Sequence, residues 1–442
     1  MLFELAEEAK REVSKYCDDY EVYIDKTEVL QLDSQKTDLN FAKEEISLGL
    51  GIRVIKDGKI GFAFTSDMDK IAKTAEDAFE NSKLNVVDEN FSFAEKEKLP
   101  TVKNTFDKKF KELELEEITS SMKDLLSIVE DKNCQATSGG FSAAEGETLI
   151  LNSNGVLAHD ESTGFAIGIS VNAENGGEIS TAYDSVSSCL YDLDGEKLFN
   201  DVCDLAKNSL NGEHIETDDM DVVFDYHAAT GLLSTFLSGF NADSVQRGRS
   251  LLADKLNESI VSENLSIYDD GTYDGGLNSS ICDGEGSASK KTTLVEEGVL
   301  KNFLYDIYTS NKAKNQFGLE NVKSTGNGFR SSYSDTPSVS ASNICFDFKE
   351  RSQIEDIQKG CIATDVLGAH TANPFSGDFS VEVNNAFMVE NGEITKPIKK
   401  AMISGNIYKL LSDCEAIGNE VKQRGSFIIP KVLVHNLRVI DN

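Results

Sequence analysis

The sequence is poor in basic residues. Its 442 residues include 43 Lys and Arg against 76 Asp and Glu, which gives a formal net charge of −33. A protein that binds DNA or RNA directly neutralises phosphates with clustered Lys and Arg side chains, and this chain has no basic run with interleaved aromatic residues. The composition therefore argues against nucleic-acid binding, and the charge favours solubility.

The sequence also lacks long hydrophobic runs. No stretch approaches the roughly 20 apolar residues that span a bilayer. The first eight residues have neither the basic start nor the apolar core of a secretory signal. The 8 cysteines are scattered without a close pair, which argues against a disulfide framework and against a zinc ribbon. We therefore expect a cytoplasmic protein with reduced thiols and no membrane association.

Common catalytic motifs are missing as well. None of the 5 histidines precedes a Glu, and no two lie within one helical turn, so the chain has no H-E-x-x-H zinc helix. It has no G-x-S-x-G elbow and no Walker loop. Two glycine pairs, at 284–286 and 326–328, do not join a strand to a helix start, so we interpret them as loop turns. We assign no catalytic residue and no metal ligand.

The residues that are present indicate a globular protein of α+β class. The chain is 39% apolar and 27% charged, and its length predicts two or three domains. Strands and helices occur in blocks without steady alternation. The acidic stretch 211–221 is predicted to be a linker. We therefore predict an N-terminal α+β domain (residues 1–215) and a C-terminal domain of mainly antiparallel sheet with helices (residues 216–442).

Hydrophobic periodicity and turn residues predict the individual elements. In the first half we expect a helix within 1–16, strands at 20–32, 46–55 and 60–64, short strands within the Gly- and Ser-rich stretch 136–188, and helices ending near 82, 130 and 210. In the second half we expect a strand at 222–224, a helix at 227–240, hairpins at 293–305 and around Asn391-Gly392, a helix at 307–317 and a short helix near 354–359.

Three motifs, taken in order, resemble signatures of the TldD/PmbA family. The first is G-I-R-V-I-K-D-G-K-I-G-F-A at 51–63, followed by Thr-Ser-Asp at 65–67. The second is T-T-L-V-E-E-G-V-L at 292–300. The third runs from Asn373 to Asn406 and begins N-P-F-S-G-D-F-S. The resemblance covers nearly the whole chain and implies kinship with proteins once called modulators of DNA gyrase and now regarded as metalloproteases.

The resemblance also identifies a branch. In the TldD branch a helix carries H-E-x-x-x-H, and a late Cys completes the zinc site. Matching Gly239 to the family's Gly puts Thr235 and Phe240 at the two His positions and Phe236 at the Glu position. Thr and Phe cannot replace two histidines as zinc ligands, and the surroundings of Cys414 do not match those of the ligand Cys. The chain is more similar to the PmbA (TldE) branch, which pairs with TldD and lacks its own zinc.

The resemblance thus implies a PmbA/TldE-like subunit of a zinc metalloprotease that acts on unfolded or small peptides. No cofactor is expected in this chain, and zinc is expected on a TldD-type partner. The partner is either that zinc-bearing subunit or a second copy in a homodimer. Two alternatives stay open. One is an autonomous hydrolase with a non-zinc site, and the other is a homodimeric peptide-binding protein.

Five residues are candidates for contacts with a substrate or partner: His227, Thr235, Asn373, Ser376 and Asp378. His227 stands at an expected helix start, where a capping or core role competes with a chemical one. The loop 373–380 is dense in Asn, Ser and Asp, which could form hydrogen bonds with an extended peptide. Alternatively, these side chains only satisfy the loop's own backbone. The sequence does not decide between the two roles.

Overall fold

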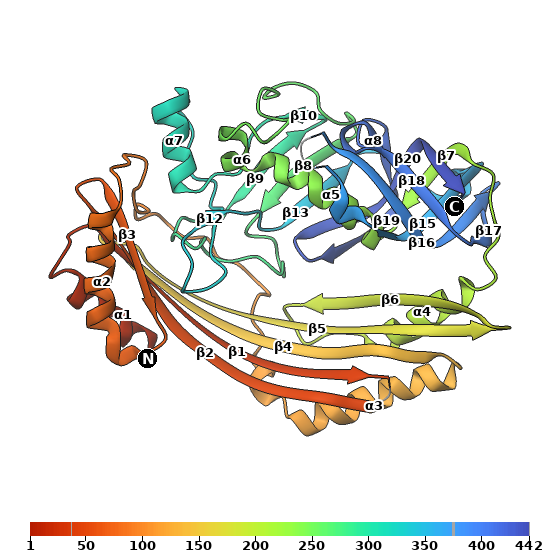
Figure 1. Cartoon of the computed structure of the whole chain (residues 1–442), viewed down its shortest axis with the longest axis horizontal. Helices are drawn as coiled ribbons and strands as arrows, with labels where there is room; N and C mark the ends of the chain where they lie inside the picture. The colour runs from red at the N-terminus through yellow and green to blue at the C-terminus, as the bar shows by residue number, and fades with distance from the viewer. Residues whose placement is uncertain (37, 374–375, 442) are drawn as a thin grey trace.

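The computed structural model describes residues 1–36, 38–373 and 376–441, and it has the predicted α+β class. Its N-terminal half is built on a six-stranded antiparallel sheet in the order β3-β2-β1-β4-β5-β6. Figure 1 shows the long curved strands of this sheet below the C-terminal half of the chain. The strands are β1 (Tyr20–Gln35), β2 (Asp38–Lys56), β3 (Lys59–Thr65), β4 (Gln135–Asn152), β5 (Leu157–Asn175) and β6 (Glu178–Ser188).

Four amphipathic helices cover one face of this sheet. They are α1 (Leu2–Val13), α2 (Ile71–Leu84), α3 (Leu115–Asp131) and α4 (Gly195–Asn208). The first two bury their apolar faces against one end of β1 and β2, and α3 and α4 cover the other end of the sheet. Asp67 caps the 3-10 turn η1 (Met68–Lys70), which leads into α2. The opposite face of the sheet is left for the C-terminal half of the chain.

The prediction of short strands within 136–188 was wrong. The segment forms β4, β5 and β6, of which β5 alone has 19 residues. Likewise, β2 begins at Asp38, eight positions before the predicted start at Ile46. Glycine has low strand propensity, but β4 and β5 are held by pairing on both sides, and β5 also by burial of alternate residues such as Phe165 and Ile167. Local patterning does not report such neighbours.

The C-terminal half forms a second, twelve-stranded sheet. Its main path runs β10-β9-β8-β13-β20-β18-β16-β15-β7, and β14, β17 and β19 pair beside it. The bounds are β7 (Asp218–Phe224), β8 (Leu265–Asp270), β9 (Lys291–Glu296), β10 (Val299–Leu300), β13 (Ile344–Phe348), β14 (Arg351–Ser352), β15 (Lys359–Leu367), β16 (Asp378–Glu390), β17 (Glu393–Ile398), β18 (Ala401–Asn406), β19 (Cys414–Arg424) and β20 (Phe427–Asp441). A separate two-stranded ribbon joins β11 (Gly328–Phe329) to β12 (Ser338–Val339).

The helices of this half are α5 (Tyr226–Leu237), α6 (Ala242–Gln246), α7 (Ile307–Phe317) and α8 (Ile407–Leu410). The predicted helix at 307–317 is confirmed, and so is the hairpin at Asn391-Gly392, which joins β16 to β17. The helix predicted near 354–359 shrinks to the 3-10 turn η4 (Ile354–Asp356), because β15 begins at Lys359. Among the described residues, no helix combines the length and apolar character needed to cross a bilayer.

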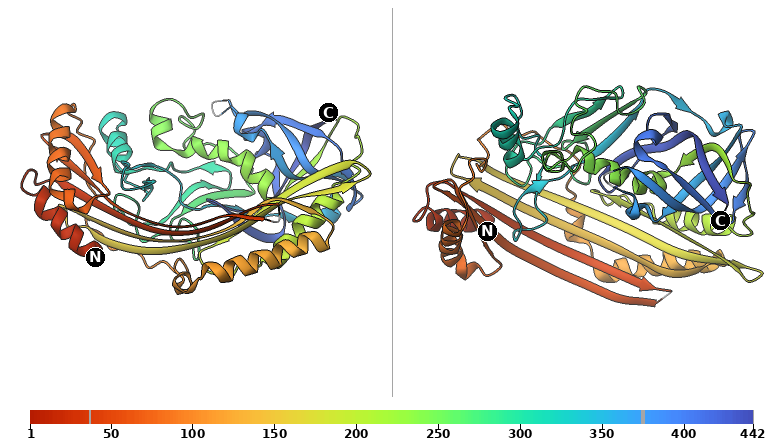
Figure 2. Two further views of the ribbon diagram at one scale, coloured as in Figure 1. Left: turned by 60° about the horizontal axis from the view of Figure 1, so that its bottom comes forward. Right: turned by 45° about the horizontal axis from the view of Figure 1, so that its top comes forward.

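The two sheets are stacked, and the two ends of the chain lie at opposite ends of the molecule (Figures 1 and 2). One sheet is built from segments within residues 20–188 and the other from segments within 218–441. The predicted boundary after residue 215 falls between α4 and β7, and it stays a prediction. A small apolar cluster joins the two halves, with Tyr23 and Ile150 on the first and Cys282 and Ile307 on the second.

Candidate functional site

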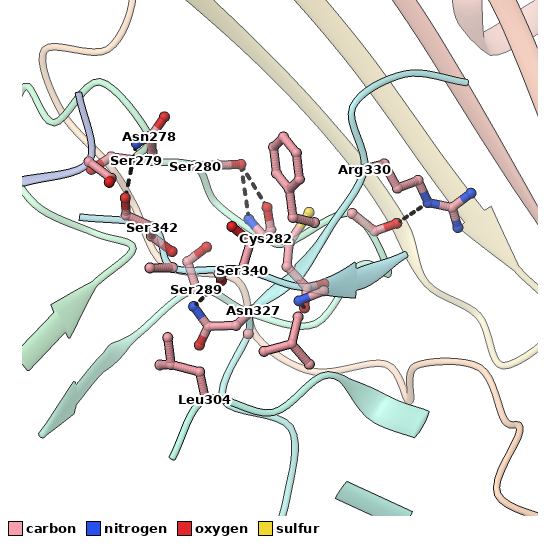
Figure 3. Close-up of a pocket in the computed structure, with 18 of the residues that line it drawn as sticks. Asn278, Ser279, Ser280, Cys282, Ser289, Leu304, Asn327, Arg330, Ser340 and Ser342 are labelled. Carbon is pink, nitrogen blue, oxygen red and sulfur yellow. Dashed lines mark hydrogen bonds between the residues drawn. The ribbon is translucent and has the colours of Figure 1, made fainter. Parts of the chain in front are cut away.

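A cavity with a volume of about 880 Å³ lies between the N-terminal sheet and the C-terminal half of the chain. The N-terminal sheet forms one wall with β4 and β5, and the other walls come from loops of the C-terminal half and from the end of α5. Serine and asparagine side chains dominate the labelled lining in Figure 3. These polar residues are Ser279, Ser280, Ser289, Ser340, Ser342, Asn278 and Asn327. A cleft between domains with many hydrogen-bonding groups is a common place for ligand binding.

Carboxylates stand beside this cavity. Asp283 lines it and accepts hydrogen bonds from the backbone N–H groups of Gly328 (2.8 Å) and Glu285 (2.9 Å). Burial raises the pKa of Asp283 to about 6. Asp269 lies behind the wall, where its Oδ2 accepts a 2.8 Å hydrogen bond from Asn327, and burial raises its pKa to about 6 as well. The cavity therefore adjoins carboxyl groups that take up protons at mildly acidic pH.

Both glycine pairs that the sequence analysis treated as loop turns border this cavity. Gly284 and Gly328 line it, and Gly326 adopts a left-handed backbone with φ of 76°. A side chain at Gly284 would clash, because its Cβ would lie 2.8 Å from the carbonyl oxygen of Gly328. Glycine is needed at this position for close backbone approach. Two G-x-G segments of similar composition were the only signal in the sequence that could have located this wall.

A buried ion network joins the N-terminal sheet to the cavity loops. Arg53 on β2 binds Glu21 on β1 through two hydrogen bonds of 2.9 and 2.7 Å, and Arg330 from the second half binds the same carboxylate. The side chains of Glu21 and Arg330 are both fully buried. Burial alone would raise the pKa of Glu21, but Arg330 and Arg53 together lower it. Arg330 also donates to the carbonyl of Gly284 (2.7 Å), as Figure 3 shows.

This network explains part of the first sequence motif in physical terms. Arg53 lies within that motif, and Gly51 beside it touches a loop of the second half. A Cβ at Gly51 would lie 2.5 Å from the carbonyl oxygen of Tyr333, and one at Gly49 would lie 2.4 Å from the Tyr333 ring. The glycines let the two halves approach closely, and the arginine fixes their relative position. The motif therefore holds the cavity walls together.

The helix α5 and the 3-10 turn η3 (Ser238–Phe240) that follows it carry the positions that the resemblance assigns to the zinc motif. Phe236 and Phe240 are fully buried in the C-terminal core, where their rings meet edge to face at 5.1 Å. Thr235 is half-buried, and its carbonyl accepts a hydrogen bond from Ser238. Cys414 is buried as well, and burial raises its pKa to about 12. These residues do not fit zinc, since none of the three helix positions offers an imidazole or carboxylate.

More broadly, the described residues contain no group of three or more His, Cys, Asp or Glu placed to hold a metal ion. The end of α5 nevertheless reaches the cavity, where Ser234 and Leu237 form part of the wall. Thr235 lies on the same turn but is not among the residues that line the cavity. The helix thus borders the site without supplying metal ligands.

His227, at the start of α5, links the two halves of the molecule. Its Nε2 lies 2.7 Å from Oδ1 of Asp184 on β6, and Arg424 on β19 contacts the same carboxylate oxygen at 2.7 Å. Burial would raise the pKa of Asp184, but His227 and Arg424 lower it. The cap of α5 is Asp225, not His227. His227 is half-buried in this contact and does not line the cavity.

The loop before β16 is organised around Asp378. Its carboxylate accepts hydrogen bonds from Ser376 Oγ and from Asn406 Nδ2, both at 2.8 Å, and Asn406 with Ser376 lowers its pKa. Asn373 accepts a hydrogen bond from the backbone N–H of Ser376. These contacts join side chains of the loop to one another, to Asn406 at the end of β18 and, at Asn373, to the loop's own backbone. Pro374 and Phe375 lie outside the described residues, and the three polar residues do not line the cavity.

Comparison with known proteins identifies the family. Models of the PmbA/TldA metallopeptidase family match in three pieces: domain 1 at residues 20–82, the central domain at 108–210 and the C-terminal domain at 217–441. An uncharacterized protein of Methanocaldococcus jannaschii, MJ0231, is 38% identical over 419 residues, which cover 94% of this chain and 92% of that protein. The chain belongs to the PmbA/TldD metallopeptidase family.

Other members of the PmbA/TldD family share the sequence and the fold over almost the whole length. Metalloprotease PmbA of Escherichia coli O157:H7 is 23% identical over 433 residues, which cover 96% of this chain and 92% of the relative. The crystal structure of TldE from Thermococcus kodakarensis superposes with a TM-score of 0.91 at 25% identity and covers 99% of this chain and 100% of its own. A putative modulator of a DNA gyrase from Thermotoga maritima gives a TM-score of 0.90 at 25% identity, with coverage of 99% and 100%.

Proposed function

We propose that this chain is the PmbA/TldE-type subunit of a two-chain zinc peptidase and does not carry the zinc itself. In this assignment a TldD-type partner supplies the metal, which activates water for hydrolysis of unfolded or small peptides. The present chain supplies structure and part of the chamber that holds the peptide. The chain is then a cytoplasmic protein that depends on its partner for activity.

The observation that carries the proposal is the composition of α5 and of the turn η3 that follows it. At the positions that the resemblance assigns to two histidines and a glutamate, this chain has Thr235, Phe240 and Phe236. The two phenylalanines are fully buried and pack on each other. Restoring a zinc site here would require an imidazole in place of a core aromatic ring, at a cost of several kcal/mol in packing. The aromatic side chains at these positions are therefore part of the hydrophobic core and not of a metal site.

The cavity supports the second part of the proposal. Its wall offers hydroxyl and amide groups from Ser, Asn and backbone, interrupted by the exposed ring of Phe329. An extended peptide presents alternating N–H and C=O groups that such a wall can pair with, and its side chains can rest on apolar patches. The polar groups fix a backbone without selecting a particular side chain, which suits peptides of varied sequence.

Reconstitution of the two-chain enzyme tests this proposal. The chain is purified from its native cell, the co-purifying chains are identified, and peptide cleavage is measured for each chain alone and for the pair. We expect a co-purifying chain with H-E-x-x-x-H and a late Cys, no cleavage by the present chain alone and cleavage by the pair. Cleavage of an unfolded peptide by this chain alone would overturn the assignment and favour an autonomous hydrolase.

A second function, a homodimeric peptide-binding protein, is favoured by one observation, the cavity itself with its serine- and asparagine-rich wall. It requires no catalytic partner. Peptide binding by the chain alone at micromolar concentration, with no co-purifying zinc-bearing chain, would favour this alternative.

A further inference from the structure

The two margins of the N-terminal sheet differ in how they are covered. The margin at β6 lies against the second half of the chain, where Asn385 donates a 3.1 Å hydrogen bond to the carbonyl of Thr181 and Arg424 donates to Ser185. The margin at β2 is only partly paired. β3 pairs with residues 50–56 of β2, and residues 38–49 pair with β1 alone in the described part of the chain. We call residues 38–48 the open edge.

The open edge is exposed on both faces as well as along its margin. Residues 40–47 are all exposed, and they include two large apolar side chains, Phe41 at 48% and Ile46 at 69%. At about 3.4 Å per residue, the edge presents roughly 35 Å of strand whose outward N–H and C=O groups have no strand partner. Natural proteins blunt or cover edges of this length, because they pair readily with other strands. A strand from another chain would complete the sheet here.

A second copy of this chain is a poor match for the open edge. Two antiparallel strands related by a two-fold axis pair residues that point to the same face. A register centred on Lys43, Glu44 or Glu45 sets that charged residue opposite itself, and like charges directly opposite are destabilising. Registers centred on Phe41 or Ala42 cross the β-bulge at Asn40, where the pairing of β2 with β1 skips one residue and a continuous ladder is interrupted. A register centred on Ile46 pairs no more than residues 44–48 of the open edge. The net charge of −33 adds general repulsion between two copies.

We propose that the open edge binds a strand of a different chain, one that carries basic residues opposite Glu44 and Glu45 and apolar residues opposite Phe41 and Ile46. This inference rests on the subunit role proposed above, and it adds the surface through which the partner is held and the charge of the partner's strand. Strand addition of this kind draws its strength from main-chain hydrogen bonds and its selectivity from side-chain pairs.

The test combines hydrogen exchange with a charge reversal. Exchange of the amides at 38–48 is compared between the chain alone and its complex with the co-purifying zinc-bearing chain. The variant Glu44→Lys with Glu45→Lys is compared with a matched reversal, Glu161→Lys with Glu174→Lys, at exposed positions on β5. We expect protection of the open edge only in the complex. We also expect about ten-fold weaker assembly for the edge variant and unchanged assembly for the matched reversal.

Each of the other possible outcomes contradicts a different part of the proposal. A complex that forms while the amides at 38–48 exchange freely contradicts the edge proposal and leaves the subunit role intact. Protection of the edge in the chain alone, in a concentration-dependent manner, shows self-pairing and contradicts a different partner. Equal weakening by both charge reversals assigns the effect to net charge, which contradicts edge recognition. Absence of any complex with a zinc-bearing chain overturns the subunit role itself.

Discussion

Two of the ion contacts that join the halves of this molecule differ in burial and chemistry. The first, between Glu21, Arg53 and Arg330, is fully enclosed and contains no histidine. The second, between Asp184, His227 and Arg424, is partly open to solvent, with 28% of the Asp184 side chain exposed. The first fixes the wall of the cavity, and the second ties β6 to α5 and β19. The comparison indicates a rigid contact at the cavity and an adjustable one at the far margin of the sheet.

The largest effect is expected at the enclosed contact. Arg330→Met would leave Glu21 with one of its two arginine partners and no access to water. Breaking a buried ion network in this way costs about 3–5 kcal/mol of unfolding free energy. Denaturant unfolding measures the change. The matched control is Arg438→Met, which removes an exposed ion pair with Asp219 and should cost less than about 1 kcal/mol. Equal effects of the two substitutions would refute the distinction between the contacts.

A smaller effect, with a characteristic pH dependence, is expected from Asp269 behind the cavity. Its folded-state pKa of about 6 lies above the ordinary value, so its contribution to stability is fully present below about pH 4 and is lost as the pH rises through 6. The loss amounts to roughly 3 kcal/mol. Asp269→Asn should remove this component from the pH profile of unfolding free energy. A variant whose profile between pH 4 and 7 matches the wild type would contradict this account.

The partly open contact at Asp184 should give a pH dependence of the unfolding free energy with the opposite sign. The pKa of Asp184 is lowered in the folded protein, so its contribution is present above about pH 4 and is lost as the pH falls below that value. Asp184→Asn is expected to cost about 1–2 kcal/mol at neutral pH and to flatten the acid limb of the stability profile. Thermal unfolding at pH 3 and pH 7 distinguishes this result from a pH-independent loss.

The smallest effect is expected at Asp378, because its contacts lie within the C-terminal half and do not connect the two halves of the molecule. It is bound by Ser376 and Asn406 within one loop region. Asp378→Ala should increase local hydrogen exchange in residues 376–380 and leave both assembly and peptide cleavage by the two-chain enzyme unchanged. Loss of cleavage in an intact complex would show that the loop contacts substrate, which is the alternative that the sequence left open.

The elements that the sequence predicted well are those whose determinants are local. The helix at 307–317 has a capping Asp306 directly before it and Gly318 directly after it, and the Asn391-Gly392 turn specifies its own hairpin. The lengths of β4 and β5 were underestimated because their Gly and Ser residues resemble loops until the neighbouring strands are known. The contacts that define the site were also invisible, because Glu21 and Arg330 lie far apart in the chain and no periodicity connects them.

The features of the candidate site can also be divided into those that the sequence predicted and those that it did not. The substitution of Thr235, Phe236 and Phe240 at the expected ligand positions could be read from the sequence by resemblance alone. The wall of the cavity could not, because it is assembled from loops whose composition is typical of turns. His227 was correctly identified as a residue near a helix start, but its partner Asp184 lies on the other half of the molecule.

The central claim, that this chain has no zinc site of its own, is tested most directly by metal stoichiometry. The chain is purified without chelators, alone and together with its co-purifying partner, and zinc per polypeptide is measured by elemental analysis and native mass spectrometry. The account predicts no stoichiometric zinc in the chain alone and one zinc in the pair, located on the partner. One tightly bound zinc in the isolated chain, with His227 as a ligand, would contradict it.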